Sequence, residues 1–135
     1  MLQVKRVVTC FLESENEILI LRRSELVGSY QGRWAGVSGY IETTADEQAL
    51  TEIEEETSLC SEDLKLIKRG KPLPIKDERL SVKWVVHPYL FHIEDREKIK
   101  IDWEHKEIRW IKPEDLENYQ TVPKLKETLA QVYKS

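Results

Sequence analysis

Three glutamates, Glu52, Glu55 and Glu56, have a spacing that could bring three carboxylates to one cation. At 100° per residue on an α-helix, Glu55 and Glu56 fall about 60° behind and 40° ahead of Glu52, so all three leave one stripe of the helix. Two carboxylates about 6 Å apart repel by roughly 3 kcal/mol at an effective dielectric constant of about 20. In a cleft such a stripe needs a positive partner, and Mg²⁺ prefers one or two carboxylates together with waters and phosphate oxygens.

The sequence around these glutamates contains no basic residue. Between Trp34 and Lys65 there are nine acidic residues and neither lysine nor arginine. A solvated acidic helix face is the more common explanation of such a pattern taken alone. The glycine-containing turn over residues 34–42, directly before the helix, favours the alternative of metal-assisted phosphate chemistry.

A capping box predicts where this helix begins. In Thr44-Ala45-Asp46-Glu47 the threonine hydroxyl and the glutamate carboxylate can each accept a free amide of the first turn, so the helix should begin near Ala45. Ser58 and Leu59 mark its expected end. The apolar side that should meet the core consists of Ala49, Leu50, Ile53 and Thr57.

Apolar runs predict the strands around the helix. They cover residues 4–12, 18–21, 64–67, 80–87, 89–93, 99–101 and 108–111, with a hairpin turn over 13–17 and loops over 24–33 and 70–78. Pro88 implies a bulge or a sheet edge in the longest strand. Pro113 and Pro123 suit the first positions of two closing helices, the last of which should bury Val122, Leu125, Leu129 and Val132. This order predicts an α/β/α sandwich built around a mixed β-sheet.

The composition favours one domain over residues 1–135 and a small anionic partner. The formal net charge is −4, and because nine of the 25 acidic residues lie in the acidic stretch, the remaining sequence has 16 acidic against 21 basic residues. That excess is too diffuse to favour nucleic acid, which would select a clustered basic face. The chain shows no secretory signal and no apolar run as long as a membrane span, so a cytoplasmic protein without a membrane partner is expected.

Neither the cysteines nor the histidines have a spacing that predicts a metal site, and most of the tryptophans are expected in the core. Cys10 and Cys60 stand far apart in apolar-looking segments, which predicts free buried thiols. The three histidines have no zinc-like spacing with either cysteine: His87, His92 and His105. Three tryptophans are expected in the core rather than in base stacking, namely Trp34, Trp84 and Trp110, whereas Trp103 suits either role.

The residues from Gly39 to Leu59 resemble the signature of the Nudix hydrolases, G-x5-E-x7-R-E-U-x-E-E-x-G-U with U apolar. Gly39 fits the first glycine, and Glu52-Ile53, Glu55-Glu56 and Leu59 fit the later positions. Residues 34–42 are similar to the tryptophan and P-G-G-x-U-E approach of that family. Further along, the spacing of Glu104, Glu107 and Trp110 resembles its E-x2-E-x2-W run.

Four positions depart from the family signature. Thr43 stands at the first glutamate, Thr51 replaces the arginine, Ser58 replaces the second glycine, and the interval from Gly39 to Thr43 is two residues short. In the family the arginine helps to orient the catalytic glutamates. A serine in a left-handed conformation costs only about 1–2 kcal/mol, so the change at Ser58 is mild.

The resemblance implies a metal site and a set of substrate contacts. Mg²⁺, with Mn²⁺ as an alternative, would be held by the Gly39 carbonyl, Glu52, Glu55 and Glu56, with Glu104 as a further ligand or general base and Glu107 as its competitor. Arg22 or Arg23 would bind substrate phosphates, and strand alternation lets only one of them face the cleft. Arg33 and Lys83 are weaker candidates for the same contact.

The expected function is Mg²⁺-dependent hydrolysis of the diphosphate linkage in a nucleoside diphosphate derivative, by attack of water at phosphorus. The main alternative is a non-catalytic Nudix-like module that senses a nucleotide, motivated by Thr43 and Thr51. An isopentenyl-diphosphate isomerase would need a cysteine near the glycine turn, where neither Cys10 nor Cys60 lies. RNA binding would need a basic groove with exposed aromatics. A homodimer remains open.

Overall fold

Eight strands and two α-helices form the part of the chain that the computed structural model describes, residues 2–133. The strands are β1 (Gln3–Ser14), β2 (Glu17–Arg23), β3 (Trp34–Ala35), β4 (Val37–Tyr40), β5 (Leu64–Arg69), β6 (Leu73–Asp77), β7 (Val82–Ile93) and β8 (His105–Ile111). The α-helices are α1 (Ala45–Thr57) and α2 (Leu125–Ala130), and three short 3₁₀ helices cover Ser61–Asp63, Arg96–Lys98 and Pro113–Asn118. No helix within these residues combines the length and the hydropathy needed to cross a membrane.

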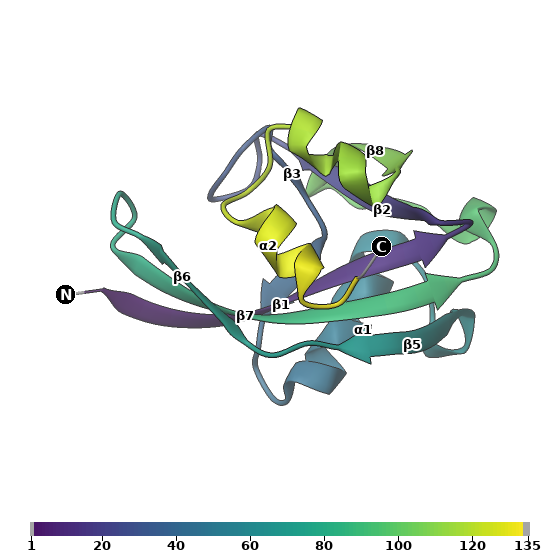
Figure 1. The fold of residues 1–135 in the computed structure, drawn as a ribbon, viewed down its shortest axis with the longest axis horizontal. Coiled ribbons are helices and arrows are strands. Elements are labelled where there is room, and N and C mark those ends of the chain that lie inside the picture. The colour runs from purple at the N-terminus through teal and green to yellow at the C-terminus, as the bar shows by residue number, and fades with distance from the viewer. Residues whose placement is uncertain (1, 134–135) are drawn as a thin grey trace.

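All eight strands belong to one mixed sheet. The long strands β1 and β7 run parallel side by side at its centre (Figure 1). The main hydrogen-bonded path is β3-β2-β1-β7-β5, while β4 pairs with β1, β6 with β7 and β8 with β2. The remaining pairs are antiparallel, so the predicted mixed sheet is confirmed.

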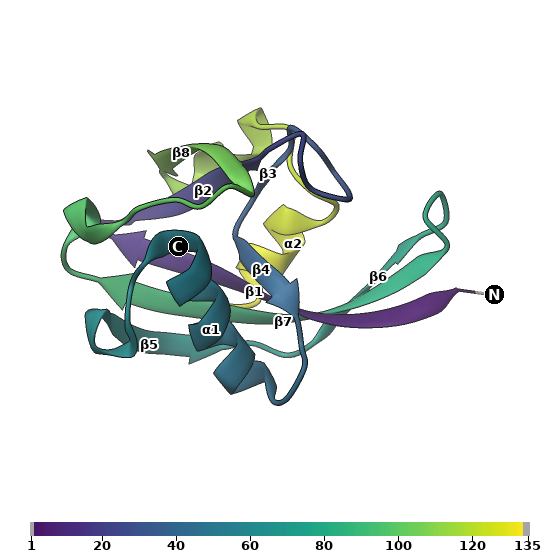
Figure 2. The same cartoon turned by 180° about the vertical axis from the view of Figure 1, so that it is seen from behind.

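The two α-helices cover opposite faces of the sheet. Along β1, Val8 and Cys10 point into the core that contains Ala49 and Ile53 of α1, whereas Phe11 points into the core under α2. The side chains alternate in this way because successive residues of a strand face opposite sides. Figure 1 shows α2 in front of the sheet, and the reverse view in Figure 2 shows α1 in front. The predicted α/β/α sandwich is therefore confirmed.

The sheet divides where β3 passes into β4. β3 pairs with β2, opposite Leu21, whereas β4 pairs with β1, opposite Cys10. Gly36 lies between them, and a Cβ at this position would sit only 2.9 Å from the backbone oxygen of Cys10. Within the described residues β1 and β2 pair only next to their hairpin, at Glu13 and Ser14. This divergence of β1 from β2, bridged by residues 34–40, is called the fork, and it lies along one side of the cavity described below.

The hairpin and the helix start follow the sequence pattern. Glu15 and Asn16 have φ values of 53° and 66°, the left-handed pair expected of a two-residue hairpin turn. At the start of α1 the Glu47 amide donates to the Thr44 hydroxyl at 3.2 Å. The Glu47 carboxylate accepts a hydrogen bond from the Thr43 hydroxyl at 3.1 Å, in place of the reciprocal contact expected of a capping box. α1 ends where Ser58 adopts the left-handed conformation, with φ of 67°.

Several sequence predictions were wrong. Residues 70–78 were predicted as a loop but contain β6, which pairs with β7, and residues 99–101 form no strand. Leu50 was expected in the core but is 39% exposed, while Gln48 and Glu56 are buried on α1. Cys60 is exposed, although both cysteines are free as expected.

The strand β7 is continuous through Pro88. Its antiparallel partner changes there, from β6, whose first residue Leu73 lies opposite Val86, to β5, whose last residue Arg69 lies opposite Tyr89. A residue without an amide hydrogen fits this gap between two partners. The expectation of a bulge or a sheet edge at Pro88 was wrong, because β7 lies inside the sheet between β1 and β5, and the irregularity lies in β5, between Leu66 and Lys68.

Candidate active site

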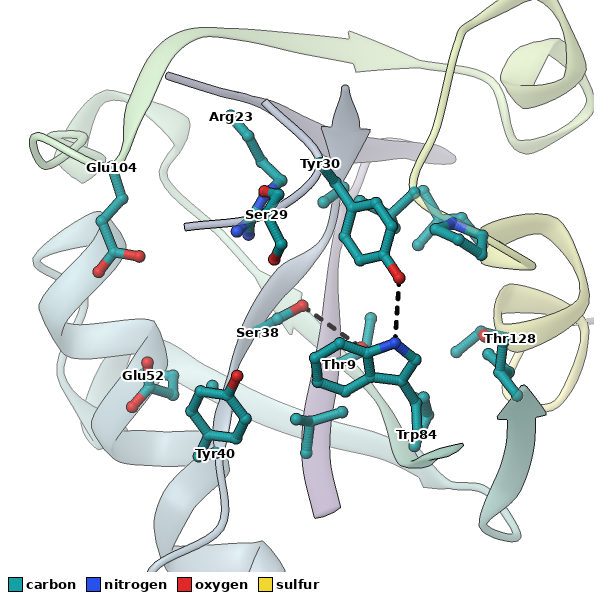
Figure 3. Close-up of a pocket in the computed structure, with 18 of the residues that line it drawn as sticks. Thr9, Arg23, Ser29, Tyr30, Ser38, Tyr40, Glu52, Trp84, Glu104 and Thr128 are labelled. Carbon is teal, nitrogen blue, oxygen red and sulfur yellow. Dashed lines mark hydrogen bonds between the residues drawn. The ribbon is translucent and has the colours of Figure 1, made fainter. Parts of the chain in front are cut away.

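A cavity of about 300 Å³ opens beside the fork in the sheet. One end holds Glu52, Glu104 and Arg23, and the wall beside it holds the aromatic rings of Tyr30, Tyr40 and Trp84 (Figure 3). The other lining residues are Val7, Thr9, Ser29, Ala35, Ser38, Gly39, Glu42, Gln48, Ile75, Val86, Val122, Pro123, Leu125 and Thr128. The cavity thus joins a charged end to an aromatic and apolar end, which suits a ligand with the same two parts.

Gly39 and Glu52 are in direct contact at the charged end. A Cβ added to Gly39 would overlap the Glu52 carboxyl group, so only glycine lets the helix approach β4 this closely. Gln48 Nε2 donates to Glu52 Oε2 at 2.7 Å, and the Glu42 amide donates to Gln48 Oε1 at 3.1 Å. The turn after β4 therefore fixes the orientation of the Glu52 carboxylate through one glutamine.

Burial raises the pKa of Glu52, and repulsion from Glu55 and Glu104 adds to the shift. The shift in pKa is larger at Glu56, which lies one turn further along α1 and is only 1% exposed. Burial raises the pKa of Glu56 well above its usual range, with further contributions from Glu52 and Glu104. Raised pKa values of neighbouring carboxyl groups are typical of sites where a cation or a proton is exchanged.

Glu56 also has an unpartnered oxygen. Among the described residues, none donates a hydrogen bond to Glu56 Oε2, which is buried. Most buried polar atoms are paired, and an unpaired one costs about 1–3 kcal/mol, more when it is charged. An unpartnered carboxylate oxygen beside a second carboxylate is a donor set that fits a hard divalent cation.

His105 lies next to the other oxygen of the Glu56 carboxylate, Oε1. Its Nε2 is 3.5 Å from Glu56 Oε1, and its Nδ1 is 3.0 Å from Asp102 Oδ1; the side chains of His105 and Glu56 are each 2% exposed. From its spacing in the sequence His105 was considered only as a zinc ligand, and its contact with Glu56 was not predicted. Its position directly after the candidate Glu104 was the one available signal.

The structure separates the two later glutamates. Glu104 lines the cavity, and its backbone oxygen accepts a hydrogen bond from the Ser24 amide at 2.8 Å. Glu107 instead pairs with Arg22 at 3.0 Å, on the partner position across β2 and β8. Of the two, Glu104 is therefore the one near Glu52 and Glu56.

The arginines are separated in the same way. Arg23 lines the cavity, and its Nε donates to the Ser29 backbone oxygen at 2.9 Å. Burial lowers the pKa of Arg23, which Glu104 and Glu56 partly offset. Arg22 is turned toward Glu107, and Arg33 donates to the Thr121 oxygen at 3.3 Å outside the cavity lining.

Three aromatic side chains form the wall of the cavity. Trp84 and Tyr40 are stacked, with ring centroids 6.2 Å apart. Trp84 Nε1 donates to the Tyr30 hydroxyl at 3.0 Å, and this hydroxyl donates to Asp77 Oδ2 at 2.6 Å. Burial and the contact with Asp77 raise the pKa of Tyr30 to about 12, so the hydroxyl keeps its proton. Trp84 was expected in the core, but besides packing beside Ile75 it presents its ring to the cavity.

The remaining tryptophans lie outside this wall. Trp34 is buried as expected, and Trp110 packs at the core with Arg96 4.0 Å from its ring centre. Trp103 is 63% exposed. Neither Trp103 nor Trp110 lines the cavity.

The third glutamate of the stripe is placed differently from its neighbours. Glu55 is exposed and lies outside the cavity lining, although its charge acts on Glu52. Between residues 2 and 133 no three acidic, histidine or cysteine side chains are arranged to hold a metal ion. Waters and substrate oxygens would therefore have to complete the coordination, as is usual for Mg²⁺.

Comparison with known proteins identifies a family. A family model described as the NUDIX domain matches residues 3–133. No curated protein matches the chain. Similar solved structures include a MutT NUDIX hydrolase from Burkholderia pseudomallei, which is 20% identical with a TM-score of 0.77 over 97% of this chain and 99% of that one.

Two further solved structures share the fold. An Ap4A hydrolase of C. elegans, in a binary complex, is 15% identical with a TM-score of 0.74 over 94% of this chain and 93% of that one. A bifunctional NMN adenylyltransferase/ADP ribose pyrophosphatase from Francisella tularensis, complexed with AMP and a manganese ion, is 18% identical with a TM-score of 0.79 over 96% of this chain and 41% of that one. Because the family model matches nearly the whole sequence and these structures share its fold, the chain belongs to the Nudix family of hydrolases.

Proposed function

We propose that this protein is a Mg²⁺-dependent hydrolase that cleaves the diphosphate linkage of a nucleoside diphosphate derivative. The observation that carries the proposal is the buried, unpartnered oxygen of Glu56, one helical turn from Glu52, which lines the charged end of the cavity. Such a pair of carboxylates is stabilised when a divalent cation binds. Family membership supports the same reaction class.

The metal-binding groups in this proposal are Glu52, Glu56 and the Gly39 carbonyl. Glu55, on the exposed side of α1, and Glu104, in the loop before β8, would be further ligands. Mn²⁺ would be held by the same oxygens. A cation held by these groups would supply neutralisation of diphosphate charge and a more acidic bound water. Gln48 holds Glu52 in place by a hydrogen bond before the substrate arrives, and Gly39 leaves the room that the Glu52 carboxyl group occupies.

Two further side chains act on the substrate. Arg23 presents its guanidinium to the cavity while Ser29 fixes its Nε, so its remaining donors can bind phosphate oxygens. The Glu104 carboxylate accepts a proton from the attacking water, and its place in the cavity lining supports this role over Glu107. Partial burial of Arg23 strengthens its attraction for phosphate.

The nucleoside would occupy the aromatic end of the cavity. Tyr40 and Trp84 offer flat faces at the wall, and bases stack well on such rings. The relatives support a nucleotide ligand, because one is an Ap4A hydrolase and another is complexed with AMP and manganese. A small nucleotide derivative, rather than a nucleic acid, fits a cavity of about 300 Å³.

The test is a panel of nucleoside triphosphates, ADP-ribose, diadenosine polyphosphates and nucleotide sugars, assayed for product with Mg²⁺ and with EDTA. We expect Mg²⁺-dependent turnover of at least one compound, lowered by about two orders of magnitude in Glu56→Gln, the range seen for loss of one catalytic group. Glu54→Gln is the matched control, because Glu54 is exposed on the same helix and outside the cavity lining. An equal rate in Glu56→Gln and wild type would refute the role of Glu56.

A non-catalytic nucleotide sensor is the second candidate. It is favoured by Thr43 and Thr51, two threonines where the family signature has a glutamate and an arginine. Both are exposed, and the Thr43 hydroxyl is used at the helix start by Glu47. Saturable nucleotide binding in calorimetry, without turnover of any compound in the panel, would support the sensor.

A further inference from the structure

A buried histidine contacts Glu56 from a different element, and on the basis of the proposed function we infer that His105, anchored by Asp102, is a positioning residue. It holds Glu56 Oε1, so that Oε2 is left free and correctly oriented for the cation. One oxygen of the Glu56 carboxylate thus contacts the imidazole while the other is left for the ligand, and His105 itself makes no contact with the substrate.

The first step is the contact itself. His105 Nε2 lies 3.5 Å from Glu56 Oε1, and both side chains are 2% exposed. Within residues 2–133, His105 is the one basic side chain within 4.0 Å of the Glu56 carboxylate. Glu56 Oε2 has no partner among the same residues. The two oxygens therefore differ: one faces a ring nitrogen and the other is available to a ligand.

The second step is the orientation of the imidazole. Asp102 Oδ1 is 3.0 Å from His105 Nδ1, and the Asp102 side chain is 16% exposed. A carboxylate in this position accepts the Nδ1 proton, which fixes the ring and turns Nε2 toward its other neighbour. Similar outer contacts of metal-ligating groups typically change metal affinity by about 10–100-fold when they are removed.

The third step is the backbone that places the ring. His105 begins β8 and pairs with Arg23, where the register between β2 and β8 shifts after Arg22. A β-bulge of this kind re-aims the side chains next to it. The irregularity thus places two side chains at the charged end together, with Arg23 at the cavity and His105 against Glu56.

The helix α1 itself supplies no basic side chain to contact the Glu56 carboxylate. Glu52 repels Glu56, and no lysine or arginine lies between Trp34 and Lys65 to offset the charge from within the helix region. Thr51, where the family signature has an arginine, is exposed and uncharged. His105 supplies the missing contact from β8 instead.

The experiment compares two isosteric replacements of the ring. A glutamine Nε2 reaches about as far as the imidazole Nε2, whereas an asparagine amide reaches only the Nδ1 position. We would measure Mn²⁺ affinity of the full chain by electron paramagnetic resonance of free Mn²⁺, together with the melting temperature in EDTA. His105→Asn should weaken Mn²⁺ binding by about 10-fold or more, and His105→Gln by less than about threefold.

Two further variants complete the design. Asp102→Ala removes the anchor from outside the core and should weaken Mn²⁺ binding by about 10-fold, and it decides the matter if the His105 variants do not fold. His92→Gln is the control, because His92 contacts Glu13 and Glu94 and lies outside the cavity lining. It should leave Mn²⁺ affinity unchanged.

The outcomes separate this inference from the proposed function. Equal Mn²⁺ affinity in His105→Asn and His105→Gln, or an unchanged affinity in Asp102→Ala, overturns the inference while hydrolysis by wild type stands. Mn²⁺ binding by wild type without turnover of any substrate overturns the hydrolase and leaves the same comparison to judge His105. A purely structural role predicts that affinity follows the melting temperature in all variants, and that result also overturns the inference. Absence of Mn²⁺ binding by wild type overturns both.

Discussion

At the scale of single residues, function and stability conflict at Glu56. A carboxylate that is 1% exposed, with one unpartnered oxygen, weakens the fold unless a cation is bound. Residues selected for chemistry often carry such a cost in stability. The conflict makes the role of Glu56 measurable without any substrate.

We predict that Glu56→Gln stabilises the metal-free protein at pH 8. Glutamine cannot ionise, so replacing a carboxyl group whose pKa is raised by burial should raise the free energy of unfolding at this pH by about 0.5–2 kcal/mol, seen as a rise of about 2–6 °C in melting temperature by scanning calorimetry in EDTA. Glu54→Gln, on the exposed side of α1, should stay within about 0.5 kcal/mol of wild type. Excess Mg²⁺ at about 100 times its dissociation constant should stabilise wild type by about 2.7 kcal/mol, and the Glu56→Gln variant clearly less. A destabilised Glu56→Gln would contradict this account of the carboxylate.

A second prediction concerns Gly39. Gly39→Ala puts a Cβ onto the Glu52 carboxyl group and must displace it, so kcat should fall by about 100-fold, as for a displacement of about 1 Å in a catalytic group. Gly28→Ala is the matched control, because a Cβ there meets nothing within 4 Å. Steady-state assays of both variants with the best substrate of the panel provide the test. Equal activity of the two variants would show that the closeness of Gly39 and Glu52 is unimportant.

The sequence predicted part of this residue-scale picture. Spacing alone placed Glu52, Glu55 and Glu56 on one stripe of a helix, and charge alone indicated a need for a cation. It could not distinguish buried Glu56 from exposed Glu55, because that difference arises from packing of α1 against the sheet. His105 was missed because its contact with Glu56 joins two segments 49 positions apart.

At the scale of elements, the long strands β1 and β7 are also joined by an ion pair. Glu13 and His92 occupy partner positions of the two strands, with His92 Nδ1 at 2.8 Å from Glu13 Oε1. The hydrogen bond to Glu13 raises the pKa of His92 above its usual value of 6.5. A histidine with a raised pKa stabilises the folded state when it is protonated.

This pair gives a pH-dependent stability. The contribution of His92 should be fully present below about pH 6.5 and should be lost as the pH rises through the higher pKa of the folded state. We expect wild type to exceed His92→Gln in free energy of unfolding at pH 6, by less than about 1 kcal/mol because the pair is partly exposed, and to match it more closely at pH 9. Urea unfolding of both proteins at the two pH values checks this. A difference that grows with pH would contradict the assigned direction of the shift.

Elements were predicted well where a local signal exists. The cap at Thr44 and the left-handed Ser58 bound α1 because each satisfies backbone groups of the helix. The strand β6 was missed because Pro72 and Pro74 suggest a loop, yet the strand lies at the sheet edge, where proline is tolerated. Residues 99–101 have a strand-like sequence but no partner strand among the described residues, since only tertiary pairing decides that.

At the scale of the whole molecule, the fork in the sheet brings the charged and aromatic groups to one cavity. β3 pairs with β2 and β4 pairs with β1, so the chain crosses from one strand to the other at Gly36 and delivers Gly39 and Tyr40 beside α1. The loop before β8 brings Glu104 to the same end (Figure 3). The order of elements predicted the sandwich, but the cavity depends on pairing between distant strands that no local pattern encodes.

The central claim is that Glu52 and Glu56 bind a divalent cation beside the charged end of this cavity. The most direct measurement is an anomalous difference map from crystals of the full chain grown with Mn²⁺ and a nucleotide product such as AMP. We predict a manganese peak bonded to Glu56 Oε2 and to the Glu52 carboxylate, at about 2.0–2.3 Å from each oxygen. Nucleotide density in the cavity with no peak at these two carboxylates, or a peak at another site only, would contradict the account.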